Sequence, residues 1–186
     1  MNGERGAESR GLPGPINVPA AWRGAELFER DDWLIELTSG HIGEIEAALM
    51  SAESSGRHFE EMTIEEFPLP ELRKLLEHVQ EQLEHGSGGC MIRGLAVKDF
   101  SEEQLRRIFW GIALHLGTPV SQSAAGERIF SVRDEGYKID QPQARGPNTK
   151  KRLSFHTDRC DVIGFLCLQP AARGGDNQLV SSVTLY

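Results

Sequence analysis

The 186-residue chain has few cysteines and no long apolar run, and both features exclude classes of protein. Its three cysteines, Cys90, Cys160 and Cys167, lack the C-x-x-C spacing of metal sites, and their odd number disfavours a disulfide framework. No run approaches the ~18 apolar residues of a membrane span. The start also lacks the basic and apolar regions of a secretory signal. We therefore expect a protein of the reducing cytoplasm with no membrane partner.

Basic residues are also scarce relative to acidic ones. The chain has 20 Lys and Arg against 28 Asp and Glu, which gives a net charge of −8. This balance argues against a nucleic-acid partner, and solubility is the simpler explanation for the charge. Nothing in the sequence indicates an oligomeric state. The length suits one domain with a sizeable core, and neither a repeat nor a linker divides the chain.

The first third of the chain predicts a leader followed by helices and a short strand. Residues 1–20 are rich in Gly and Pro with little apolar periodicity, which indicates a flexible leader. Residues 33–37 are expected to form a short strand, and apolar spacing predicts a helix over residues 39–51. The acidic stretch 54–66 is interpreted as a solvated loop.

Two further helices are predicted from apolar stripes. The first stripe, with helical spacing, consists of Leu72, Leu75, Leu76, Val79 and Leu83. The second helix begins at Ser101, which fits a capping box with Gln104. Its stripe consists of Leu105, Ile108, Phe109, Ile112 and Leu116. Between the two helices, residues 90–95 are predicted to form a short buried strand.

The second half of the chain is predicted to consist of strands and loops. Residues 128–132 alternate in polarity, which predicts a strand, and residues 141–148 are interpreted as a loop. Nearly continuous apolar sequence over residues 162–168 is typical of a strand buried on both faces. Gly174 and Gly175 predict a turn, after which residues 178–183 are expected to start another strand.

His156 and Asp158 are the candidate metal ligands. Residues 153–158 alternate as a strand does, and in a strand residues i and i+2 project from the same face, about 7 Å apart. An imidazole and a carboxylate can therefore converge on one divalent metal. Completed by a second His, such a pair forms the facial triad of non-heme Fe(II) oxygenases. The alternative is a strand-end pair whose side chains hydrogen-bond each other or the neighbouring backbone.

The residues around His156-Thr157-Asp158 form a longer pattern. Its other members are Phe155, Asp161, the apolar run 162–168, Pro170-Ala171, Gly174-Gly175 and Ser181-Ser182. In order and spacing this pattern resembles the TauD/TfdA family of Fe(II)- and 2-oxoglutarate-dependent dioxygenases, which includes taurine dioxygenase-like and clavaminate synthase-like enzymes. A looser likeness extends back to about Gly89.

The resemblance implies an α+β fold whose incomplete core is a double-stranded β-helix, or jelly roll, with N-terminal flanking helices. Residues 21–186 would be the N-terminal portion of that domain. The resemblance also implies that His156 and Asp158 bind Fe(II), with 2-oxoglutarate and O2 as cosubstrates and a small organic molecule as substrate. Asn177 is a candidate contact for 2-oxoglutarate, because its amide donates hydrogen bonds. The alternative for Asn177 is a turn residue before a strand.

Three polar residues are weaker candidates from the same resemblance. Gln122, Ser123 and Arg128 lie between the Gly117-Thr118-Pro119 turn and the metal motif, a part of the chain that lines the substrate pocket in this family. The alternative for Arg128 is an exposed strand residue with no role in binding.

The family pattern includes two residues that this sequence does not show after Asp158. They are a distal His, which is the third iron ligand, and an Arg that pairs with the far carboxylate of 2-oxoglutarate. The other histidines, all before the motif, are His41, His58, His78, His85 and His115. The sequence is therefore interpreted as the N-terminal part of a dioxygenase, truncated at its C-terminal end. The alternatives are a catalytically inactive fragment or remnant, and a cupin-like metal-binding module without oxidation chemistry.

Overall fold

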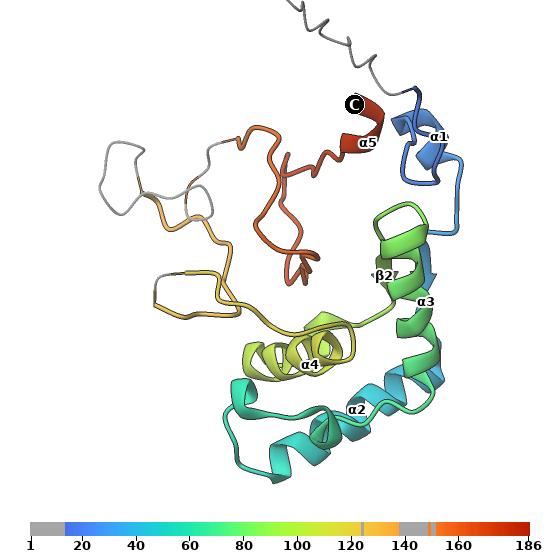
Figure 1. Ribbon diagram of the computed structural model, residues 1–186. Helices are drawn as coiled ribbons and strands as arrows, with labels where there is room; N and C mark the ends of the chain where they lie inside the picture. Colours follow the sequence, from blue (N-terminus) through green and yellow to red (C-terminus); the bar gives the residue numbers. More distant parts are fainter. Residues whose placement is uncertain (1–13, 124, 138–148, 150–151) are drawn as a thin grey trace, which may run out of the picture.

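The computed structural model describes residues 14–123, 125–137, 149 and 152–186 of the chain. Residues 1–13 of the predicted leader and the whole predicted loop 141–148 lie outside the described residues. Figure 1 shows a helical first part, drawn in blue to green-yellow, and an irregular second part in orange and red that ends in a short helix.

The secondary structure consists of helices and two short strands. The α-helices are α1 (Gly24–Phe28), α2 (Ser39–Ser54), α3 (Leu72–His85), α4 (Glu102–Leu114) and α5 (Ser182–Leu185). The strands are β1 (Leu34–Glu36) and β2 (Met91–Arg93). Three short 3-10 helices are η1 (Phe59–Glu61), η2 (Ile64–Glu66) and η3 (Val97–Asp99). This mixture agrees with the predicted α+β class, whereas two strands do not test the predicted jelly-roll core.

The three long helices confirm the predictions from periodicity and capping. Helix α2 starts at the predicted residue and ends three residues beyond the predicted end. At the start of α4, the Ser101 Oγ accepts from the backbone N–H of Gln104 at 3.2 Å, and the Gln104 side chain accepts from the backbone N–H of Ser101 at 2.9 Å. The predicted capping box is therefore present, and it satisfies two backbone donors that the helix itself leaves free.

The core lies among α2, α3 and α4 and the segment that joins α2 to α3. Its buried members are Ile45, Ala48, Leu49, Ala52, Phe59, Met62, Phe67, Leu69, Leu72, Leu76, Ile108 and Trp110. Two of them, Phe59 and Met62, come from residues 54–66, so the acidic stretch predicted as a solvated loop also carries core side chains. The reason is that η1 buries Phe59 and the following Met62, whereas Glu61 beside them is exposed.

Strands β1 and β2 form a parallel two-stranded sheet in which Ile35 faces Ile92. Both strands were predicted, but the prediction that β2 is buried was wrong. Met91 is 48% exposed and Ile92 is 37% exposed, whereas Ile35 of β1 is only 7% exposed. The apolar sequence of β2 alone therefore did not ensure its burial.

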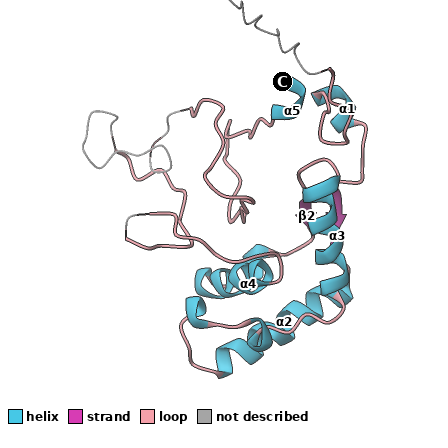
Figure 2. Cartoon of the chain, in the orientation of Figure 1, coloured by secondary structure: helices cyan, strands magenta, loops and turns pink. Residues whose placement is uncertain are grey.

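The strand predictions for the second half of the chain were wrong. Residues 128–132, 153–158, 162–168 and 178–183 form no strand, and Figure 2 draws the described residues between α4 and α5 as loop. A strand exists only when another strand accepts and donates its backbone hydrogen bonds. Residues 152–180 make no backbone–backbone hydrogen bond with the described part of the chain. Ser182–Leu185 instead forms α5, capped by Ser181.

The two ends of the described chain meet. Ser181 Oγ donates to the carbonyl of Ala20, and Thr184 Oγ1 donates to the carbonyl of Trp22 at 2.8 Å. Helix α5 therefore lies beside the segment that precedes α1, as Figure 1 also shows. No helix in the described ranges has the length and apolar character needed to cross a membrane.

Candidate functional site

The two candidate metal ligands lie on the irregular stretch that precedes α5. His156 and Asp158 are both exposed, and neither belongs to a strand. The strand geometry that was expected to place their side chains on one face is therefore absent. They remain neighbours because only one residue separates them along the backbone.

The imidazole of His156 has a defined tautomer. Its Nδ1 lies 2.8 Å from the carbonyl oxygen of Ser154. A carbonyl oxygen only accepts, so Nδ1 carries the proton and donates, and the lone pair of a neutral ring is on Nε2. A hydrogen bond from one ring nitrogen to a backbone carbonyl commonly orients a histidine that binds a metal through its other ring nitrogen. It is also the backbone hydrogen bond that the alternative interpretation of His156 described.

Asp158 supplies an unpaired carboxylate next to this histidine. It forms no hydrogen bond or ion pair with any described residue, and its exposure keeps its oxygens accessible. A neutral imidazole nitrogen and a free carboxylate are two of the donor types that divalent iron takes in non-heme oxygenases. The local chemistry therefore suits a metal ion, although the positions of the two side chains do not form a preorganised site.

The donor set is incomplete within the described ranges. No group of three or more His, Cys, Asp or Glu side chains there is arranged to hold a metal ion. The three cysteines are free thiols, and none of them completes such a group. The described residues thus fit two positions of a metal ion's coordination shell and do not fit a complete three-ligand site.

The candidate cosubstrate residue, Asn177, lies in the same irregular stretch. It is exposed and follows Gly174 and Gly175, whose φ angles of 66° and 76° are positive. Positive φ is readily adopted only by glycine, which explains the pair at this position. No described contact joins Asn177 to His156 or Asp158, so its role stays a prediction.

The weaker candidates lie near α4. Ser123 Oγ donates to the Glu127 carboxylate at 2.8 Å, and the backbone N–H of Gln122 donates to the Glu127 carbonyl at 2.6 Å. These bonds close a short turn. The Arg128 guanidinium lies 5.6 Å from the ring centroid of the buried Trp110, a distance suited to a cation–π contact. Arg128 is exposed, as the alternative interpretation expected, but it lies against Trp110 of α4 and does not belong to a strand.

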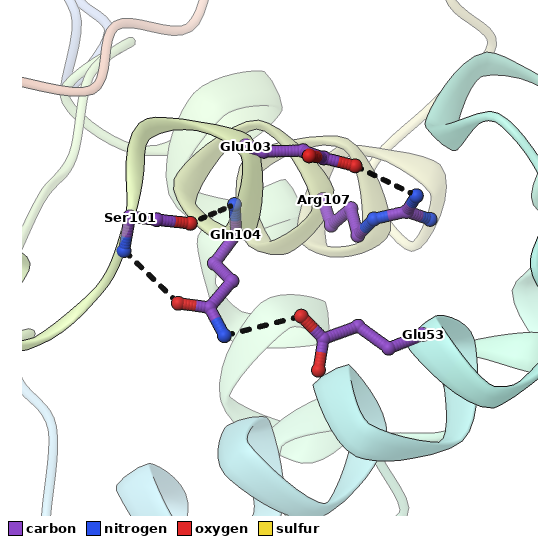
Figure 3. A pocket seen from close by; sticks show the side chains of 5 residues that line it. All are labelled: Glu53, Ser101, Glu103, Gln104 and Arg107. Atoms are coloured by element: carbon purple, nitrogen blue, oxygen red, sulfur yellow. Dashed lines mark hydrogen bonds and ion pairs between the residues drawn. The ribbon is translucent and has the colours of Figure 1, made fainter.

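A polar hollow of about 470 Å³ lies between the end of α2 and the start of α4 (Figure 3). Its lining residues are Glu53, Ser101, Glu103, Gln104 and Arg107. Gln104 donates to Glu53 at 3.1 Å, and Arg107 donates to Glu103 at 3.1 Å, so these polar groups satisfy one another. The hollow contains none of the predicted site residues, and we interpret it as the capped junction of two helices.

Ser154 is the site residue that the sequence did not single out. Its carbonyl orients His156, and this contribution comes from the backbone, so the residue type gave no signal. The sequence signal that could have indicated this contact is the two-residue separation of Ser154 and His156, which brings the Ser154 carbonyl within reach of the His156 Nδ1.

Comparison with known proteins identifies similar sequences over most of the chain. The family described as "Taurine catabolism dioxygenase TauD, TfdA family" matches residues 52–186. The chain is 30% identical over 176 residues to FR-33289 synthase of Streptomyces rubellomurinus, across 94% of this chain and 52% of the relative. It is 27% identical over 182 residues to the taurine hydroxylase-like protein SAT17 of Stachybotrys chartarum, across 94% of this chain and 47% of that relative. The chain thus spans about half the length of the curated relatives it matches.

Proposed function

This chain belongs to the TauD/TfdA family of dioxygenases, and we propose that it supplies His156 and Asp158 as two iron ligands of an Fe(II)- and 2-oxoglutarate-dependent hydroxylase. The proposed substrate is a small organic molecule, and the proposed core is an incomplete jelly roll. Asn177 is proposed to contact 2-oxoglutarate. The three free thiols are compatible with a reducing cytoplasm.

The observation that supports this proposal best is the hydrogen bond from His156 Nδ1 to the Ser154 carbonyl. In the neutral ring, this hydrogen bond leaves the lone pair of Nε2 directed away from the backbone and available to a metal. The exposed carboxylate of Asp158 is available in the same way. The contribution of this chain is therefore to present an imidazole and a carboxylate from positions two residues apart and to leave the remaining coordination positions to other groups.

A second candidate function is a metal-binding or remnant domain without oxygenase turnover. The observation that favours it is the absence of a third donor side chain near His156 and Asp158 in the described ranges. Two side chains hold a divalent ion weakly and leave its orientation poorly defined.

Anaerobic titration of the purified chain with Fe(II) tests the ligand assignment. We expect His156→Ala and Asp158→Ala each to weaken Fe(II) binding by at least about tenfold, because loss of a residue that merely hydrogen-bonds to a metal ligand already lowers metal affinity about 10- to 100-fold. His85→Ala is the matched control, since this histidine lies in the last turn of α3 and is exposed. Equal affinity of the wild type and the His156→Ala variant would rule out the ligand role of His156.

Conversion of 2-oxoglutarate to succinate then separates the two candidate functions. Succinate formation that a chelator abolishes would support the hydroxylase. Absence of turnover from a folded chain that binds Fe(II) through His156 would support the non-catalytic domain.

A further inference from the structure

A side-chain hydrogen bond joins the two ends of the irregular loop 152–178, which holds the candidate site. The Arg152 guanidinium donates to the side-chain carbonyl of Gln178 at 2.9 Å, across 26 positions of the chain. Both residues are exposed. His156 and Asp158 lie shortly after Arg152 in the sequence, and Asn177 lies directly before Gln178. The bond therefore encloses all three proposed site residues in one loop.

The described hydrogen bonds of this loop are few. Residues 152–178 make no backbone–backbone hydrogen bond with the described part of the chain. Their described side-chain hydrogen bonds are the one from Arg152 to Gln178 and the one from His156 to the Ser154 carbonyl. The second bond is local and orients one imidazole. The first has an ionised donor, which makes the stronger kind of hydrogen bond, and it restrains the separation of the two ends of the loop.

This bond shortens the path between the candidate metal ligands and Asn177. Along the chain His156 and Asn177 are 21 residues apart, a length that an extended backbone spans over about 70 Å. The path through the bond has four residues from His156 to Arg152, the two side chains, and one residue from Gln178 to Asn177. The backbone part of this second path is at most about 18 Å long. The bond thus limits how far Asn177 lies from the candidate ligands, whatever course the loop takes between them.

We propose that Arg152 is a positioning residue, whose hydrogen bond to Gln178 is a clasp that keeps Asn177 near His156 and Asp158. The inference rests on the proposed function, in which the two ligands hold iron and Asn177 contacts 2-oxoglutarate. A cosubstrate that meets both parts of the loop needs them at one separation. A clasp formed before binding removes part of the ordering cost of binding. Arg152 itself touches neither iron nor 2-oxoglutarate in this arrangement.

Pulsed electron paramagnetic resonance tests the clasp without metal or cosubstrate. One spin label is attached to Cys160, shortly after the candidate ligands, and the other to Asp176→Cys, directly before Asn177. The other two thiols are removed by Cys90→Ser and Cys167→Ser. Far-UV circular dichroism verifies that each labelled chain keeps its helices. The width of the distribution of label separations then measures how firmly the loop is held.

The expected result is a narrow distribution for the chain with the clasp and a broader one for Arg152→Ala and for Gln178→Ala. The double variant should be no broader than either single variant, because the two residues act through one contact. Arg173→Ala is the matched control, since Arg173 is exposed in the same loop and has no hydrogen bond or ion pair with a described residue. Its distribution should equal that of the chain with the clasp.

Anaerobic equilibrium dialysis of 2-oxoglutarate against the Fe(II)-saturated chain tests the positioning role. We expect Arg152→Ala to weaken 2-oxoglutarate binding about fivefold, because the net contribution of one hydrogen bond corresponds to a factor of about 2 to 13 in affinity. Its Fe(II) affinity should match that of the wild type, which a general structural defect would not leave unchanged. Arg152→Lys keeps a charged donor and should recover most of the 2-oxoglutarate affinity.

Three results would overturn the proposal: equal label distributions with and without Arg152, the same broadening in Arg173→Ala, or unchanged 2-oxoglutarate affinity in Arg152→Ala. Failure of the proposed function gives a different result. If the wild-type chain binds no 2-oxoglutarate, or binds Fe(II) equally well without His156, the proposed function and the positioning role both fail. The label separations then still decide whether Arg152 and Gln178 hold the loop.

Discussion

A substitution at Gly111 tests how α4 packs against the segment that precedes α3. This glycine lies in the buried part of α4, and a Cβ at this position would be 2.3 Å from Cγ of Phe67. Phe67 is fully buried at 0% exposure, so its ring has no solvent to move into. We therefore expect Gly111→Ala to destabilise the protein, although alanine is the better helix former.

The magnitude follows from two opposing effects. Replacing glycine by alanine inside a helix stabilises by about 0.5–1 kcal/mol. Overpacking a well-packed core costs about 1–3 kcal/mol, and a 2.3 Å contact belongs at the upper end of that range. The expected net loss for Gly111→Ala is about 2 kcal/mol. Gly43→Ala in α2 is the matched control, because nothing lies within 4 Å of its added Cβ. That variant should gain about 0.5–1 kcal/mol.

Urea unfolding followed by far-UV circular dichroism measures both variants. The midpoint should fall for Gly111→Ala and rise for Gly43→Ala, with slopes that remain unchanged if the unfolded surface is the same. A midpoint for Gly111→Ala at or above that of the wild type would refute the packing of Phe67 on α4. Adding Phe67→Leu to Gly111→Ala should recover part of the loss, since the two residues are in contact and their effects couple.

Two smaller perturbations test local contacts with the same assay. Ser101→Ala should cost about 1 kcal/mol, because it removes the Oγ that accepts from the backbone N–H of Gln104, and an equal midpoint would disprove the cap. The hydrogen bond from Arg30 lowers the pKa of Asp32, and its stabilisation is present above pH ~4 and is lost as the pH falls through the lowered value. The midpoints of Asp32→Asn and wild type should thus converge at acid pH, and a constant difference would contradict this.

The helices were predictable because their determinants lie within a few residues of one another. The apolar stripe of α3 and the capping box of α4 depend on spacings of three, four and seven residues, and both appear in the structure. The cap at the start of α3 could not be predicted in this way. The Glu44 carboxylate, on α2, accepts from the backbone N–H of Glu71 at 2.9 Å and of Leu72 at 2.7 Å. A cap supplied from another helix leaves no local pattern, so the sequence did not indicate it.

The strands were predictable only where a partner exists among the described residues. Alternation and apolar character predicted strands at 33–37, 90–95 and 162–168 alike. The first two segments pair with each other as β1 and β2, whereas the third has no backbone partner. Alternation describes which side chains a strand can bury, but hydrogen bonding to a neighbour decides whether the strand forms. A sequence pattern therefore shows which side chains a strand can bury, but it does not show whether a neighbouring strand is there to pair with it.

The candidate site shows the same division between local and distant determinants. The identity of the two candidate ligands depends only on residues 156 and 158, so a short sequence pattern indicated them. The position of the proton on His156 depends only on the nearby Ser154 carbonyl, which accepts a hydrogen bond from Nδ1. The third donor and the burial of the apolar run 162–168 depend on contacts beyond this segment, and a short pattern carries no information about those contacts.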